Sequence, residues 1–431
     1  MSSLSQTSTQ AQTPMDLIVW DVVEEHLDEA AFLWTQWERA LRSPLYKLHE
    51  LRDRVEERLL AHLDGLVVGG SQVAQRLLVP ALCEGLPGTA FAAAMALLLA
   101  ERADADDAVF AALSAAQAPQ LDEIVRALCL GPSPQRQARL LSLFAEGGAQ
   151  QTVAAHILGF QQVDLGPSLF ALFRGDDSQQ WLTGLHCLRY RPRPDCESLM
   201  VRALRSADVA VVDAGLVAAA VAALPSVLPR CRELVESAHP ATPTAALLLA
   251  ILGTEIDQHL LRRAASNKKH AKDIIFALGL CGGIDSMSAC VDWLGDDDLA
   301  LAASESFVSL TGVDAEKEKL LTQIPSSAEN DDFPDGDADL DLPVEADIPR
   351  LDPLATAAFW HSHRTQYKAG AFYLGGHVFV RSDPRAWQAA VSQANLRQRH
   401  ALALGLAVVS AGQQIIQTGA LARQQADVFA A

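Results

Sequence analysis

Apolar residues recur every thirty positions in the middle of the chain. Two rows of such positions stand out: Val201, Cys231, Leu261 and Val291, and ahead of them Leu188, Ala218, Leu248 and Leu278. A break separates the two rows in each copy, so each copy is interpreted as two short helices joined by a turn. Such a pair cannot bury its apolar stripe alone and must stack on its neighbours. The pattern predicts an all-α fold, an α-solenoid of helical hairpins about thirty residues long.

Ahead of the repeats, apolar residues three or four positions apart predict two antiparallel helices. The first runs from Val19 to Leu41 and the second from Leu48 to Leu66, with Ser43-Pro44 between them and Gly69-Gly70 after them. We expect residues 15–70 to form a helical pair that caps the stack. Residues 1–14 are rich in Ser, Thr and Gln and are predicted to be a disordered tail.

The rest of the chain divides by composition. Residues 71–328 are predicted to form the solenoid, with degenerate copies as far as about Gly175. Residues 329–352 carry ten acidic residues against one arginine and predict an extended acidic linker. Residues 353–431 have an excess of arginine and predict a small, mostly helical C-terminal module. That module is expected to begin with a short hairpin or irregular cap, and Asp383-Pro384 to open a helix.

Net charge narrows the range of partners. The chain has a formal charge of -19 at pH 7, which repels nucleic acid phosphates and anionic membrane surfaces. We therefore expect no nucleic acid and no membrane partner. Its seven cysteines form no CxxC pair, and several occupy apolar repeat positions, as expected in a reducing compartment. With neither a signal peptide nor a long apolar run predicted, the expected location is cytoplasmic.

Several segments resemble a family of uncharacterised bacterial HEAT-like-repeat proteins. These are the opening WDVVEEHLDEAAFLW from Trp20 to Trp34, the segment from Ala61 to Leu66, the segment from Glu305 to Asp314, and Arg397-Gln398-Arg399. The resemblance covers nearly the whole chain and implies short HEAT-like repeats of the kind seen in bilin-lyase-type proteins. Genes of this family tend to lie near those of type VI secretion components, which implies an accessory or adaptor role. The family has no assigned catalytic residue to carry over.

Motifs for catalysis or cofactor binding are weak. His361 and His363 would share one face of a strand and could bind a metal, but a surface pair or a histidine stacked on Trp360 is the simpler interpretation. The alternating aspartates from Asp335 to Asp341 lack the turn glycine and closing glutamate of a calcium loop. No nucleophile elbow, phosphate loop or zinc-protease motif is present in the sequence. We predict no metal, no cofactor and no enzymatic activity.

The N-terminal helical pair has two interpretations. Its tryptophans give the first helix a broad apolar face, and acidic residues lie largely on the other side. That face either packs on the first repeats or forms, in part, an exposed anchor for a partner. The candidate partner-binding residues are Trp20, Glu24, Glu25, Asp28, Trp34 and Trp37.

These observations favour a non-enzymatic scaffold or adaptor that binds another protein along the concave face of the solenoid. The resemblance implies that the partner is a type VI secretion component or an effector. Two alternatives stay open: a lyase-like or other modifying enzyme on a HEAT-like scaffold, and an immunity-like inhibitor that occupies a toxin with its acidic surface.

Overall fold

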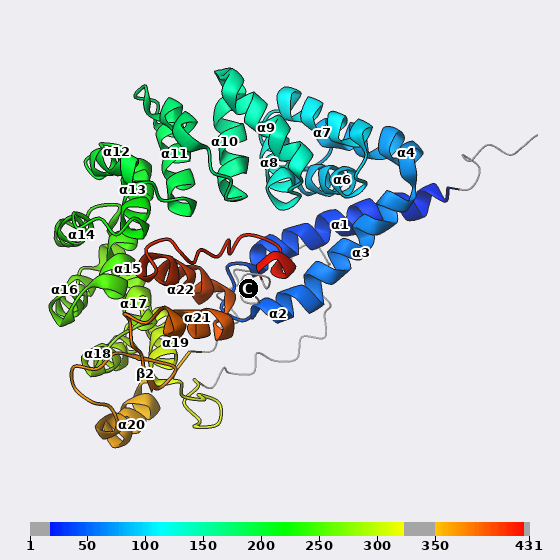
Figure 1. Cartoon of the computed structure of the whole chain (residues 1–431). Coiled ribbons are helices and arrows are strands. Elements are labelled where there is room, and N and C mark those ends of the chain that lie inside the picture. Colours follow the sequence, from blue (N-terminus) through cyan, green and yellow to red (C-terminus); the bar gives the residue numbers. More distant parts are fainter. Residues whose placement is uncertain (1–17, 323–349, 426–431) are drawn as a thin grey trace, which may run out of the picture. The chain divides into compact units, whose positions relative to one another are not determined.

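The computed structural model describes residues 18–322 and 350–425. Within these ranges the chain is almost wholly helical and successive helices pack on one another, which confirms the predicted all-α, solenoid-like fold (Figure 1). The helices form two compact units. Unit 1 holds residues 18–40, 49–157 and 420–424, and unit 2 holds residues 41–48, 158–322, 350–419 and 425. The predicted tail and almost all of the predicted acidic linker lie outside the described residues.

Unit 1 begins with a long helical hairpin and continues with shorter antiparallel helices. Its elements are α1 (Trp20–Ala40), α2 (Leu48–Leu51), η2 (Arg52–Glu56), α3 (Glu57–Val68), α4 (Gly70–Val73), η3 (Ala74–Leu78), α5 (Val79–Glu84), α6 (Pro87–Leu99), α7 (Ala103–Ala115), α8 (Gln120–Leu130), α9 (Pro134–Glu146), η4 (Gly148–Gln150) and α10 (Gln151–Phe160), whose last three residues belong to unit 2. The π-helical turns η2 and η3 each lie inside a longer helix.

The core of unit 1 is built around α6. This helix contacts α1, α3, α5, α7 and α8, and every residue from Ala90 to Leu98 is buried. Its alanines allow close packing on several sides, since small side chains let helix backbones approach one another. The predicted N-terminal pair, now α1 and α3, packs directly on this helix. The apolar face of the pair therefore packs inside unit 1.

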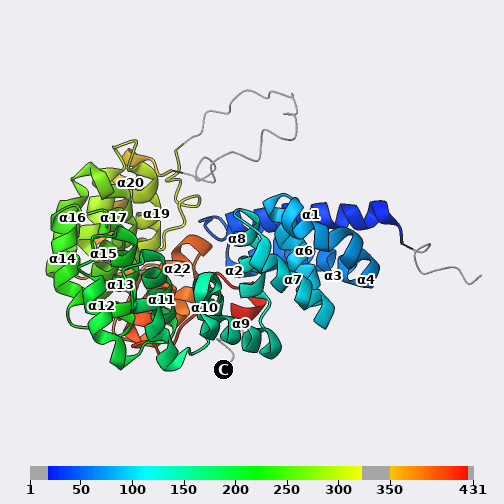
Figure 2. The ribbon, with the colours of Figure 1, turned by 90° about the horizontal axis from the view of Figure 1, so that it is seen from above.

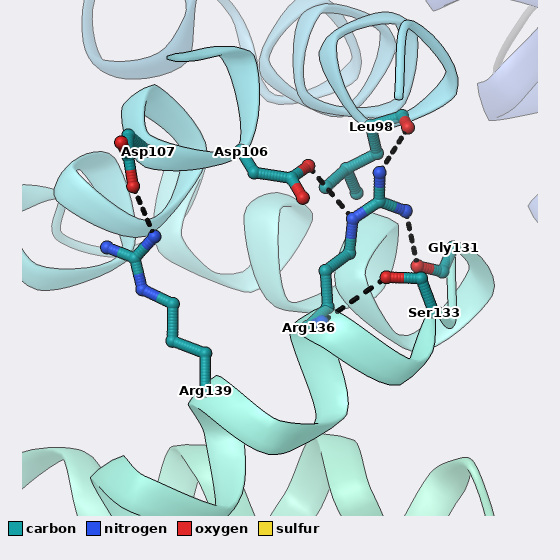
Figure 3. A network of polar contacts seen from close by, with 7 residues as sticks. All are labelled: Leu98, Asp106, Asp107, Gly131, Ser133, Arg136 and Arg139. Carbon is teal, nitrogen blue, oxygen red and sulfur yellow. Dashed lines mark hydrogen bonds and ion pairs between the residues drawn. The ribbon is translucent and has the colours of Figure 1, made fainter. Parts of the chain in front are cut away.

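A buried arginine holds the next helices of unit 1 together (Figure 3). Arg136, in α9, donates to Asp106 at 2.9 Å, to the Gly131 carbonyl at 2.9 Å and to the Leu98 carbonyl. The network thus joins α9 to α7 and to the end of α6. Arg139, one turn further along α9, makes an exposed ion pair with Asp107, and its guanidinium lies 4.1 Å from the ring centroid of Phe110. Burial makes the first network far more important for stability than the second.

Unit 2 contains the regular repeats and the C-terminal elements. Its elements are η5 (Gly166–Phe173), α11 (Ser178–Tyr190), η6 (Pro194–Cys196), α12 (Glu197–Ala203), α13 (Val209–Val221), α14 (Val227–Glu236), α15 (Thr242–Leu252), α16 (Glu255–Ala265), η7 (Lys268–His270), α17 (Ala271–Leu280), α18 (Ile284–Trp293), α19 (Ala300–Thr311), α20 (Pro353–His363), η9 (Arg364–Gln366), β1 (Tyr373–Leu374), β2 (His377–Val378), α21 (Pro384–Gln393) and α22 (Leu396–Val409).

The thirty-residue register corresponds to alternating helices. Helices α11, α13, α15, α17 and α19 pack side by side in an inner row, and α12, α14, α16 and α18 lie outside it (Figure 1). The inner row carries the series from Leu188 to Leu278, whose four members are all buried. The outer row carries the series from Val201 to Val291, in which Cys231 and Leu261 are buried. The two-helix repeat predicted from the sequence is confirmed.

Arginines with the same spacing link the outer helices. Arg202, Arg232 and Arg262 lie on α12, α14 and α16, and each pairs with an aspartate of a neighbouring segment. The pair between Arg232 and buried Asp257 is bidentate, at 2.6 and 3.0 Å. Burial alone would raise the pKa of Asp257, but bonds from Arg232 and the Thr254 backbone lower it below its ordinary value. The sequence register therefore specifies polar as well as apolar contacts between copies.

Residues 353–419 pack on the repeats of unit 2. Helix α20 packs on α18, the β1–β2 hairpin on α19, and α22 on α13, α15 and α17. The expected hairpin and the expected Asp383 cap of α21 are both present. The end of the segment predicted as a linker is ordered as well, because Leu351 pairs with Leu321.

Within the described residues, no single helix has both the length and the apolar composition needed to cross a membrane. The segments Leu48–Val68 and Gly70–Glu84 meet that test only as a pair, across a bend of 102°.

Candidate protein-binding surface

Two of the six candidate residues are core residues. Trp34 and Trp37 are buried, and the Trp34 ring stacks on Phe91 of α6 with centroids 3.4 Å apart. The Trp37 indole donates to the buried carboxylate of Glu56 at 3.1 Å. The prediction that these two tryptophans belong to a partner surface is wrong. They lie on the same side of α1 as Leu27 and Ala30, which faces the core.

The other four candidates lie near the start of α1. Trp20 is half-buried, and the guanidinium of Arg76 sits 4.1 Å from its ring centroid. Glu24, Glu25 and Asp28 are exposed, as is Asp21. Steps of about 100° per residue place all four carboxylates in an arc of about 100° on the helix. We call Asp21, Glu24, Glu25 and Asp28 the acidic stripe.

The acidic stripe has no cationic side chain to neutralise it within unit 1. No described lysine, arginine or histidine forms an ion pair with any of its four carboxylates. Farther along α1 the pattern changes, and Glu38 pairs with Arg126 at 3.3 Å. The stripe is therefore a concentrated, uncompensated negative charge at one end of the hairpin.

An apolar groove lies beside the stripe. It has a volume of about 690 Å³ between the first turns of α1 and the end of α3, and its lining includes Val19, Val22, His26, Gly65, Val68 and Gly69. Three of its valines are unusually exposed: Val19 at 63%, Val22 at 46% and Val68 at 86%. We call this feature the N-terminal groove. Exposed apolar side chains gathered beside polar residues are typical of protein-binding sites.

Close packing shapes the floor of the groove. A Cβ atom at Gly65 would lie 2.8 Å from the imidazole of His26, so only glycine fits there without displacing that ring. His26 in turn contacts His62 of α3, with the two Nδ1 atoms 3.0 Å apart. One imidazole must donate and the other accept, so this contact requires at least one neutral ring. Both contacts hold α1 against α3 beneath the groove.

Less of the inner row of unit 2 is open to a partner than the sequence predicts. In Figures 1 and 2, α22 lies against this row on the side away from α12, α14 and α16. All residues from Ala401 to Val408 are buried. The concave face expected to bind a partner is thus covered, at α13, α15 and α17, by the chain's own helix. Sequence periodicity could not show this, because α22 is remote from these helices in sequence.

A cavity of about 580 Å³ remains between α22 and the inner row. Some of its polar groups are bonded: Arg397 pairs with Glu305 at 3.1 Å, and His400 is held between Thr418 and the Leu41 carbonyl. Burial lowers the pKa of His400 below its ordinary value. These contacts anchor α22, and Lys272, Asp273 and Asp298 line the same cavity.

Neither His361 nor His363 belongs to a metal-binding arrangement within the described residues. His361 and His363 lie on α20 rather than on a strand, so their positions two residues apart point to different sides. His363 stacks on Phe359, not on Trp360. No group of three or more His, Cys, Asp or Glu is arranged to hold a metal ion anywhere in residues 18–322 and 350–425. The aspartates from Asp335 to Asp341 lie outside the described residues.

Cysteine chemistry is restricted by burial. Six of the seven cysteines are buried, and Cys83 is exposed. Burial raises the pKa of Cys129, Cys187, Cys231, Cys281 and Cys290 to about 12. A buried neutral thiol is a poor nucleophile.

The N-terminal groove was not predicted from the sequence. Val22 and Val68 lie outside the apolar rows that predict the hairpin core, and the structure shows both side chains exposed beside the groove. A usable signal was the Gly69-Gly70 pair, which ends α3 and leaves Val68 without a covering helix. Comparison of the chain with protein-family models, with curated proteins and with solved structures finds no match.

Proposed function

We propose that this protein is a non-enzymatic scaffold that binds another protein through the N-terminal groove and the acidic stripe. The observation that carries the proposal is the exposure of Val19, Val22 and Val68 around one groove. Leaving such side chains in water is unfavourable, and a partner that covers them gains about 25 cal/mol for each Å² of apolar surface buried. Helices α1 and α3, which pack on α6, carry this surface.

The biological setting that we propose comes from the family resemblance. A scaffold of this kind would serve type VI secretion as an accessory protein, with a secretion component or an effector as its partner. The acidic stripe also supports an immunity-like inhibitor, since a basic toxin would be attracted to it. A one-to-one complex that loses affinity steeply with salt favours the inhibitor, whereas a multi-protein assembly favours the accessory role.

Crosslinking in the native cell tests the proposal. A photo-crosslinking residue at position 22 should capture a defined protein, and the same residue at position 354 should not. Leu354 is a matched control because it is 84% exposed and lies on α20 of unit 2. Capture at position 22 should disappear in Val68→Asp. Equal capture at both positions, or capture that survives Val68→Asp, contradicts the proposal. Absence of any secretion protein among the captured partners contradicts the type VI setting alone.

A further inference from the structure

We infer that the partner of the N-terminal groove presents a basic amphipathic helix, which lays its apolar face on the valines and its lysines or arginines along the acidic stripe. This inference rests on the proposed function and adds the chemistry of the partner. It follows from the position of the groove relative to the stripe, from the size of the groove and from the charge around it.

The groove and the stripe are adjacent on one helix. On α1, Val22 lies next to the arc of the four carboxylates around the helix axis, and it lines the groove together with Ile18, which precedes the helix. Anything that covers Val22 therefore comes within reach of the stripe. Four carboxylates from Asp21 to Asp28 extend over about 10 Å of helix at 1.5 Å per residue. A partner without positive charge would leave them facing an apolar surface and would lose their hydration.

The dimensions of the groove suit side chains from one helical face. Its volume of about 690 Å³ accepts several aliphatic side chains. Its walls are two roughly antiparallel helices, α1 and α3, which offer the valines as a strip rather than as a deep hole. Amphipathic helices bind such strips through anchors at positions i, i+3 or i+4, and i+7. Basic residues flanking those anchors would meet the carboxylates, which have the same helical spacing.

The negative charge of the acidic stripe argues against a membrane or a nucleic acid as the partner. An anionic membrane or a nucleic acid would approach the uncompensated carboxylates of the stripe and be repelled. A basic protein segment is attracted, and its association is accelerated by the same field. The contact is therefore expected to weaken with salt, because the stripe is exposed and screening acts on it fully.

The experiment uses the full chain and two synthetic helical peptides of eighteen residues. Both peptides have the same face of leucine and valine, with lysines flanking it in one and glutamates in the other. We expect the lysine peptide to bind with a Kd on the order of 10 µM at low salt, measured by calorimetry, and the glutamate peptide to bind at least tenfold more weakly. Equal binding of the two peptides, or no binding of the lysine peptide, would overturn the inference.

Two variants locate the site. Val68→Asp should weaken binding of the lysine peptide at least tenfold, and Leu354→Asp, at a comparably exposed position, should not change it. The triple change Glu24→Lys, Glu25→Lys and Asp28→Lys should reverse the preference in favour of the glutamate peptide. All of these side chains are exposed, so the thermal unfolding midpoint should stay the same in each variant. An unaltered preference in the triple variant would overturn the inference.

Further experiments distinguish the basic helix from other possible ligands of the groove. Removal of residues 1–17 should leave the affinity for the lysine peptide unchanged, and a tenfold gain would instead assign the groove to the chain's own N-terminus. Anionic vesicles and duplex DNA should not compete with the peptide, and competition by either would overturn the inference. If the peptides fail to bind while crosslinking at position 22 still depends on Val68, the scaffold function stands and only the basic helix is wrong.

Discussion

The indole of Trp34 donates a hydrogen bond of 2.9 Å to the carboxylate of Glu123, which is 89 residues away in sequence. The contact joins α1 to α8 next to the stack of Trp34 on Phe91. The pKa of Glu123 is raised to about 7, chiefly by burial and also by the nearby charge of Glu38, against the lowering effect of the Trp34 bond. The N-terminal hairpin is therefore held to unit 1 by a carboxyl group that titrates near neutral pH.

This pair predicts a pH-dependent stability. The folded-state pKa of Glu123 lies above its ordinary value of 4.5, so the folded state holds the proton more tightly. The associated stabilisation is complete below about pH 4.5 and is lost as the pH rises through about 7. Glu123→Gln keeps an acceptor for Trp34 and should remove this dependence. We expect it to stabilise unit 1 by about 1 kcal/mol at pH 8, after allowing for solvent screening of a half-exposed group. Urea unfolding at pH 5 and pH 8 measures the difference, and an equal gain at both values contradicts it.

The network around Arg136 predicts a large effect from one substitution. Arg136→Ala leaves the buried Leu98 carbonyl and the part-buried acceptors of Gly131 and Asp106 without their donor and should reduce the free energy of unfolding by about 3 kcal/mol. Arg139→Ala removes an exposed ion pair and a contact with the Phe110 ring from the same helix and should cost about 1 kcal/mol or less. Chemical denaturation of both variants provides the comparison, and similar losses in the two would refute the distinction.

Thiol reactivity should follow burial. In the native protein, Ellman's reagent should modify one cysteine quickly, at Cys83, and reach all seven only after unfolding. Cys83→Ser should abolish the fast phase. A second fast thiol in that variant would point to a reactive cysteine and revive the modifying-enzyme alternative.

Where α22 packs on α21, even a methyl group at Gly405 should lower the stability of unit 2. A Cβ atom at Gly405 would overlap the ring of Trp387, which is fully buried. Gly405→Ala should destabilise unit 2 by about 1–3 kcal/mol, even though alanine favours helix formation by about 1 kcal/mol relative to glycine. Gly175→Ala is the control, because its Cβ would have no neighbour closer than 4.0 Å. A thermal midpoint that is unchanged or raised in Gly405→Ala would contradict this account.

The sequence predicted the features that depend on local periodicity. The rows at Leu188 and Val201, the N-terminal hairpin and the Asp383 cap all occur as expected, because each is set by spacing within one or two helices. The arginines of the outer helices, Arg202, Arg232 and Arg262, follow the same register and could have been found from it.

Features set by distant contacts could not be predicted. Trp20 and Trp34 look alike along the helix, but α6 covers Trp34 and Arg76 lies over Trp20. The burial of Trp34 depends on a helix that begins more than fifty residues later. Similarly, Val22 is exposed and the adjacent Val23 is buried, because the side of α1 that carries Val23 faces the core. The proposed partner-binding residues are therefore recognised in the structure, where no other element of the chain covers them.

The location of α22 has a consequence during synthesis. The inner row leaves the ribosome before residues 396–409 of α22 do. Until then, apolar side chains such as Leu247 and Phe276, which line the cavity beneath α22, have no cover from the C-terminus. A nascent or truncated chain that ends before Leu396 therefore exposes an apolar inner surface and is at risk of aggregation, whereas synthesis of α22 covers that surface.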